Sequence, residues 1–168
     1  FYHSRLWDCQ ASETVEGSRL DFSLESPDGD QGYPGNARIT VSYLLTEDDS
    51  LKLEYRMVSD ADTVANFTNH SYLAGHGRPD ILKQQVWINA SHYTPADEVS
   101  IPTGEIAPVA GTPMDFTEMK EIGRDIGEPF EALVLGKGYD HNWVLDHPEG
   151  ELSLAAKVYD PESGRMME

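Results

Sequence analysis

The sequence predicts an all-β fold of the β-sandwich kind, and three observations carry this prediction. Where hydrophobic residues recur regularly, their period is two residues, which is the period of a strand and not of a helix. Turn-forming clusters rich in Pro, Gly, Asp and Asn recur at short intervals along the chain. No stretch of helical length carries an apolar stripe. Short strands between frequent turns are typical of sandwiches and related β folds.

The clearest predicted element is an antiparallel hairpin. Over residues 37–45, apolar side chains at the odd positions alternate with mostly polar ones, which predicts a half-buried strand. The same alternation returns over residues 51–57, after the polar segment 47–50. A short polar loop between two such runs predicts that the strands pair with each other.

The rest of the chain shows weaker alternation. It predicts further strands over residues 63–73, 82–91, 132–135, 139–146 and 151–159. Residues 101–129 are the exception, because they are rich in Pro, Gly and acidic residues and do not alternate. We expect a long irregular excursion there, with one helical turn near residues 117–122, and excursions of this length are often functional.

The charge is strongly one-sided in a chain whose 168 residues fit one domain. Its 12 Lys and Arg stand against 30 Asp and Glu, which gives a net charge of −18. An acidic surface without a basic cluster repels nucleic-acid phosphates and anionic lipids, so neither is an expected partner. No apolar run approaches the ~18 residues of a membrane span. A single cysteine, Cys9, fits a reducing compartment and predicts a cytoplasmic protein.

The usual metal and nucleophile motifs are missing from the sequence. None of the six histidines has the spacing of a zinc site. Residues 28–32 begin like an EF-hand loop, but Ile39 stands where the bidentate Glu belongs, which favours a turn. There is no Gly-x-Ser-x-Gly elbow for a nucleophilic serine. We therefore predict neither a metal nor another cofactor.

Two polar clusters stand out, over residues 66–72 and 138–143. If the first is a strand, His70 and Tyr72 lie on one face of it, and Asp140 in the second would face away from its neighbouring histidine. Two such faces could line a polar cavity, or the groups could satisfy one another at the rim of a sandwich. The residues alone leave both interpretations open.

Motifs in a fixed order resemble the aldose 1-epimerases, also called galactose mutarotases. They are residues 31–36 (QGYPGN), 69–72 (NHSY), 93–95 (YTP), 101–106 (IPTGEI), 111–116 (GTPMDF) and 138–145 (GYDHNWVL). The resemblance covers nearly the whole chain. It implies an antiparallel β-supersandwich with sugar bound in an open cleft, of which residues 1–168 would be the central part of a single domain, incomplete at both ends.

The resemblance also implies a reaction and roles for residues. Such an enzyme interconverts the α- and β-anomers of an aldohexose of the glucose or galactose type. One group protonates the ring oxygen while another removes the proton of the anomeric hydroxyl. The match to the family motifs makes His70 the general acid, Asp140 the carboxylate that accepts hydrogen bonds from sugar hydroxyls, and Tyr72 a residue lining the site. No cofactor is implied.

The chain also departs from the family pattern. The family's general base is a glutamate near the C-terminus, and further sugar ligands precede the stretch that resembles residues 5–8. Neither part is in this sequence, so we expect an internal fragment that is inactive alone. Residues 73–75 (LAG) follow Tyr72 where the family usually reads Phe-Asn-Leu, so two residues are missing beside His70 and the sugar selectivity is open.

A second interpretation is a non-catalytic carbohydrate-binding protein on the same fold. In it, Trp7, Trp87 or Trp143 would stack on a pyranose and Asp140 would fix its hydroxyls, although tryptophans in sandwiches are more often part of the core. A phosphosugar epimerase is disfavoured, because it would need an Arg/Lys cluster for the phosphate.

Overall fold

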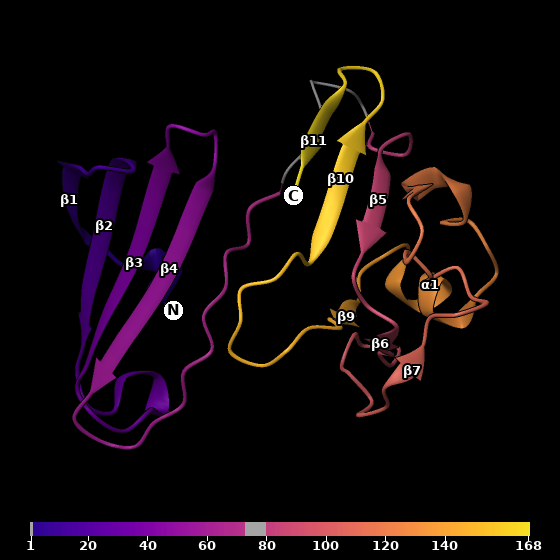
Figure 1. The fold of residues 1–168 in the computed structure, drawn as a ribbon. Helices are drawn as coiled ribbons and strands as arrows, with labels where there is room; N and C mark the ends of the chain where they lie inside the picture. Colours follow the sequence, from indigo (N-terminus) through magenta and orange to yellow (C-terminus); the bar gives the residue numbers. More distant parts are fainter. Residues whose placement is uncertain (1, 73–79) are drawn as a thin grey trace. The chain divides into compact units, whose positions relative to one another are not determined.

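The computed structural model describes residues 2–72 and 80–168, and the chain forms two compact units (Figure 1). The first unit is Phe1–Ser71 and the second is Tyr72–Glu168. The departure from the family pattern at residues 73–75 lies outside the described residues.

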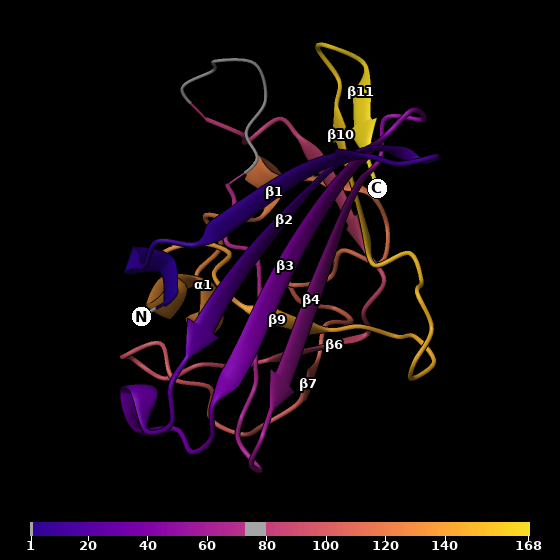
Figure 2. The same cartoon turned by 90° about the vertical axis from the view of Figure 1, so that its left-hand side faces the viewer.

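The first unit is built on a four-stranded antiparallel sheet (Figure 2). In the order β1-β2-β3-β4, its strands are β1 (Asp8–Glu13), β2 (Gly17–Ser26), β3 (Ala37–Thr46) and β4 (Leu51–Ser59). Two single 3-10 turns accompany them, η1 (Tyr2–Ser4) and η2 (Asp30–Gly32). Strands β3 and β4 pair in register from Ala37 opposite Ser59 to Leu45 opposite Leu51, which confirms the predicted hairpin.

The strand predicted over residues 63–73 is wrong for its described part, because residues 63–72 form no strand. Side-chain contacts hold this segment instead of a ladder of backbone hydrogen bonds. The Phe67 ring stacks on Tyr55 of β4, with centroids 6.3 Å apart and an interplanar angle of 5°. The Asn69 amide donates to the hydroxyl of Tyr43 on β3 at 3.2 Å. The alternating facing of His70 and Tyr72 that a strand would impose therefore does not apply.

The second unit carries shorter strands in two antiparallel sheets (Figure 1). One has the order β11-β10-β5-β8 and the other the order β7-β6-β9. The strands are β5 (Gln85–Ile88), β6 (His92–Thr94), β7 (Ala107–Pro108), β8 (Lys120–Glu121), β9 (Asn142–Val144), β10 (Ala156–Asp160) and β11 (Arg165–Met167). Strands β5 and β9 fall inside predicted segments but are shorter, and β10 overlaps the predicted segment 151–159 but ends one residue beyond it. The predicted helical turn lies later, at η3 (Ile122–Arg124).

Residues 132–135, predicted as a strand, lie in the α-helix α1 (Glu131–Gly136). Ala and Leu are good helix formers, and a run of four apolar residues is too short for its period to distinguish a helix from a strand. Ala132 and Leu133 are buried in the core of this unit. The other buried members of that core cluster are Tyr93, Val109 and Met114.

The antiparallel sheets confirm the all-β class, with α1 as a short exception. Within residues 2–72 and 80–168, no helix has both the length and the apolar character that a bilayer crossing requires.

Candidate active site

The structure places the two main predicted site residues in different units. His70 follows β4 in the first unit, and Asp140 lies between α1 and β9 in the second. Tyr72 belongs to the second unit and is 88% exposed. Each unit therefore positions its own residues, and a common site that includes both remains a prediction.

His70 is exposed on a segment that its neighbours tie down. The side chain of Asn69 makes two hydrogen bonds in opposite directions: its amide donates to Tyr43 Oη at 3.2 Å, and its Oδ1 accepts from the backbone N–H of Ser71 at 2.9 Å. These bonds fix the backbone on both sides of His70. The imidazole is thus carried by a braced loop in an accessible position.

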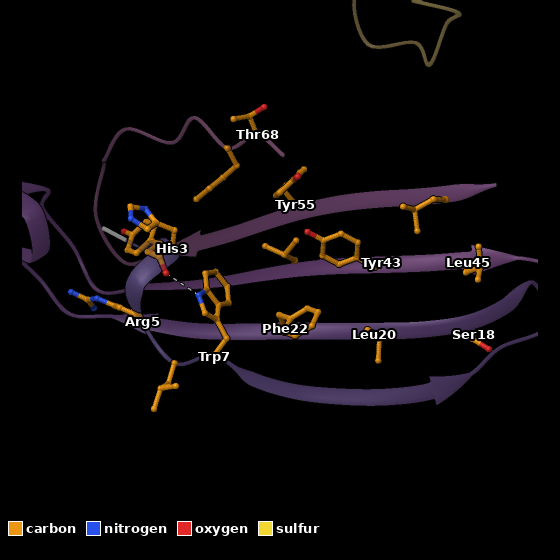
Figure 3. Close-up of a pocket in the computed structure, with 15 residues that line it drawn as sticks. His3, Arg5, Trp7, Ser18, Leu20, Phe22, Tyr43, Leu45, Tyr55 and Thr68 are labelled. Atoms are coloured by element: carbon orange, nitrogen blue, oxygen red, sulfur yellow. Dashed lines mark hydrogen bonds between the residues drawn. The ribbon is translucent and has the colours of Figure 1, made fainter. Parts of the chain in front are cut away.

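An apolar hollow lies in the same unit, on one face of the sheet (Figure 3). Its volume is about 960 Å³. Neighbouring strands contribute Phe22 and Tyr43, whose rings meet edge to face at 5.9 Å. The indole of Trp7, which also lines the hollow, donates to the backbone oxygen of Tyr2 at 3.0 Å (Figure 3). Phe67 and Thr68 complete the lining just before His70.

Sequence patterns did not predict this hollow, although the strands that line it show the alternation of a half-buried sheet. Leu20, Phe22 and Leu24 alternate with other residues, as do the apolar residues of β3. Alternation assigns side chains to a face. It does not reveal whether that face is packed or open, which depends on contacts distant in sequence.

Asp140 is exposed, and its backbone N–H makes a hydrogen bond to the side chain of the next residue, His141. The N–H of Asp140 donates to His141 Nδ1 at 3.2 Å, which favours the neutral tautomer that carries its proton on Nε2. Burial lowers the pKa of His141, while the charge of Asp140 acts in the opposite direction. The pair therefore presents an exposed acid beside a ring whose neutral form is favoured by burial.

The residues that flank Asp140 are anchored to the loop that carries Pro113 and Met114. Tyr139 donates its hydroxyl to the carbonyl oxygen of Pro113 at 3.1 Å, and the Trp143 indole donates to that of Met114 at 3.0 Å. Burial, with a smaller contribution from the charge of Asp125, raises the pKa of Tyr139 to about 12, so its hydroxyl stays a donor at neutral pH. The side chain of Asp140 is therefore exposed, while these two hydrogen bonds hold the backbone around it in place.

The tryptophans considered for sugar stacking have different surroundings. Trp143 packs against the core of the second unit, and Trp87 is half-buried in β5. Only Trp7 of the three lines the hollow. As for metals, the parts of the chain that the structure describes hold no group of three or more His, Cys, Asp or Glu side chains that could bind one.

Comparison with known proteins shows similarity along the whole chain. The sequence model of the family described as aldose 1-epimerase matches residues 1–168. The galactose mutarotase of Sus scrofa is 42% identical over 156 residues, which cover 92% of this chain and 44% of that protein. The aldose 1-epimerase of Haemophilus influenzae is 38% identical over 172 residues, covering 94% of this chain and 49% of that protein.

A solved structure agrees with these sequence matches. The galactose 1-epimerase from Lactobacillus acidophilus NCFM superposes with a TM-score of 0.84 at 32% identity, covering 93% of this chain and 45% of that one. The chain thus spans less than half of the length of each of these relatives. With the family model matched from the first residue to the last, the chain belongs to the aldose 1-epimerase family.

Proposed function

We propose that this chain supplies the general acid and a sugar-binding carboxylate of an aldose 1-epimerase acting on an aldohexose of the glucose or galactose type. The observation that carries the proposal is the match of the family model to residues 1–168. The resemblance of residues 69–72 and 138–145 to the family motifs assigns the two roles to His70 and Asp140. The exposure of both side chains supports it, because each can reach a ligand from solvent.

His70 has the chemistry that ring opening requires. As the C1–O5 bond breaks, an acid delivers a proton to the ring oxygen and a base takes the proton of the anomeric hydroxyl, which leaves an open-chain aldehyde. Rotation about the C1–C2 bond and the reverse proton transfers close the other anomer. An imidazolium can donate a proton and the neutral ring can accept one, so this side chain can give and regain a proton in each cycle.

Asp140 has the chemistry of a hydroxyl-binding group. An ionised carboxylate only accepts hydrogen bonds, and adjacent sugar hydroxyls can both donate to it. The anchored side chains of Tyr139 and Trp143 hold its backbone in place, which lowers the ordering cost of binding. Tyr72, which is 88% exposed, is the third proposed contact to the sugar.

The general base is not among the residues that the family motifs assign in this chain. We therefore propose that the 168-residue chain binds sugar without accelerating anomer exchange. Galactose binding, followed by NMR, and anomer exchange, followed by polarimetry, test the two parts separately.

The Asp140→Asn substitution should weaken galactose binding at least about tenfold, because hydrogen bonds to a charged acceptor contribute ~1.5–3 kcal/mol. Glu118→Gln, an exposed acid of the same unit, is the matched control and should leave the affinity unchanged. Absence of binding by the unsubstituted chain would contradict the proposal. Rapid anomer exchange that is lost on His70→Ala would instead show that the chain contains its own base.

One observation favours a second candidate, a non-catalytic sugar-binding protein on the same fold. Trp7 lines an open hollow, and an indole face can stack on a pyranose. On this alternative, galactose changes the fluorescence of Trp7 and Trp7→Ala abolishes binding, whereas His70→Ala has no effect even in a longer chain that includes the glutamate.

We also propose a cytoplasmic location. Cys9 is exposed and forms no disulfide in the described structure, and an exposed thiol of this kind persists in a reducing compartment.

A further inference from the structure

The second unit contains a buried ammonium group that the proposed mechanism does not use. The side chain of Lys120, on β8, is 2% exposed. Its Nζ donates to the Pro113 carbonyl oxygen at 2.6 Å and to Asp125 Oδ2 at 2.7 Å, and it lies 4.3 Å from the centroid of the Phe116 ring. A buried charge costs several kcal/mol unless it is fully paired. Lys120 meets that requirement with two acceptors and one aromatic face.

The groups that Lys120 touches are those that hold the two side chains flanking Asp140. The Pro113 carbonyl oxygen also accepts the Tyr139 hydroxyl, at 3.1 Å. The Phe116 ring meets Tyr139 edge to face at 4.9 Å and Trp143 at 5.8 Å. Lys120 and Tyr139 therefore share one carbonyl oxygen, and Phe116 contacts the ammonium as well as both rings.

We propose that Lys120 is a positioning residue for Asp140, which rests on the proposed sugar-binding function of that carboxylate. By fixing the Pro113 carbonyl and the Phe116 ring, the ammonium sets where Tyr139 and Trp143 sit. The backbone between these two anchors carries Asp140. Sugar affinity therefore depends on a lysine that touches no sugar.

A purely structural role for Lys120 would consist of its ion pair with Asp125. Arg124 provides a direct comparison, because its guanidinium binds the same carboxylate, with Nη2 3.0 Å from Oδ2, and is exposed. Among the described residues, Arg124 makes no hydrogen bond to Pro113 and no cation–π contact with Phe116, although its charge acts to lower the pKa of Tyr139. Arg124→Gln thus removes a partner of Asp125 and leaves the anchors of Tyr139 in place.

The first measurement compares galactose dissociation constants of the full chain by NMR. Lys120→Met, which keeps an unbranched apolar side chain and removes the ammonium group, should raise the constant about tenfold. Arg124→Gln should change it less than about twofold. Tyr139→Phe removes only the hydroxyl at the shared carbonyl and should raise the constant about threefold, which provides a milder variant if Lys120→Met does not fold.

The second measurement combines Lys120→Met with Asp140→Asn. If Lys120 acts through Asp140, adding Lys120→Met to the Asp140→Asn variant should weaken binding no further, whereas independent effects would multiply. An unchanged dissociation constant in Lys120→Met, or multiplying effects in the double variant, overturns the proposal.

A measurement without sugar separates this inference from the proposed function. In ¹H–¹⁵N spectra, Lys120→Met should shift the Asp140 amide and the Trp143 indole N–H signals, and Arg124→Gln should not. If the unsubstituted chain binds no galactose, the proposed function fails. In that case, the inference that Lys120 positions Asp140 is overturned only if Lys120→Met leaves the Asp140 amide and Trp143 indole N–H signals unshifted.

Discussion

Single residues in this chain show what a sequence can and cannot predict about a site. Asp140 lies at the surface, as its residue type leads one to expect. Lys120 is buried, against the strong preference of lysine for the surface, because two acceptors and the Phe116 ring converge on it through the fold. All three groups lie within seven residues of Lys120 in the sequence, but the segment has no periodicity from which their convergence could be predicted.

The lowered pKa of His141 leads to a prediction about how the stability of the fold depends on pH. Burial lowers its pKa, and its ring packs edge to face against Tyr93 at 5.9 Å. Because the pKa is lower in the folded than in the unfolded chain, the unfolded chain binds more protons in the interval between the two values. The stability that neutral His141 contributes is complete above the unfolded value of ~6.5 and is lost as the pH falls through the folded value.

Urea unfolding at pH 7.5 and pH 5.5 measures this effect. The free energy of unfolding of the unsubstituted chain should fall more between these two pH values than that of His141→Gln, which lacks the titrating group. Equal losses in the two proteins would show that His141 does not couple folding to pH.

At the scale of elements, the accuracy of the predictions follows the length of the pattern. The hairpin of β3 and β4 rests on two long alternating runs, and it forms as predicted. Residues 132–135 offered four apolar residues, and their burial in the core of the second unit is compatible with the helix that forms. Residues 63–72 alternate weakly and are held by Tyr43 and Tyr55, which sequence periodicity cannot anticipate.

Gly17, the first residue of β2, leads to a prediction about how closely two strands approach each other. Gly17 has φ +147° and lies so close to β3 that an added Cβ would meet the Leu45 carbonyl oxygen at 2.1 Å. Gly29 has φ +78°, with nothing within 4 Å of its added Cβ. Gly29→Ala should therefore cost about 1–2 kcal/mol for the left-handed backbone alone. Gly17→Ala should cost about 3 kcal/mol, because a steric clash of ~1–3 kcal/mol adds to the unfavourable φ.

Urea denaturation of both variants measures their free energies of unfolding and checks that Gly17→Ala is the less stable of the two. A Gly17→Ala chain that is as stable as Gly29→Ala would show that β2 and β3 can separate at this end without loss, and that the close approach is not required.

For the whole molecule, local patterns predicted the class but not the assembly of a site. Strand period and turn chemistry suffice for the all-β class, which the sheets confirm. His70 and Asp140 belong to different units, and strand period and turn chemistry carry no information about whether the two residues share a site. That they do is a prediction from the resemblance of their motifs to those of the aldose 1-epimerases.

The net charge of −18 leads to a prediction for the molecule as a whole. Even if each of the 12 basic side chains paired with one acid, 30 − 12 = 18 carboxylates would stay uncompensated, so their mutual repulsion opposes the compact state. Added salt also weakens exposed ion pairs such as Lys157 with Glu168, but each of these contributes at most ~1 kcal/mol. Raising NaCl from 10 to 100 mM shortens the screening length from ~30 to ~10 Å, so the long-range repulsion is reduced most. The free energy of urea unfolding at pH 7.5 should therefore rise with salt over this range. A fall would mean that the local ion pairs outweigh the repulsion among the uncompensated carboxylates.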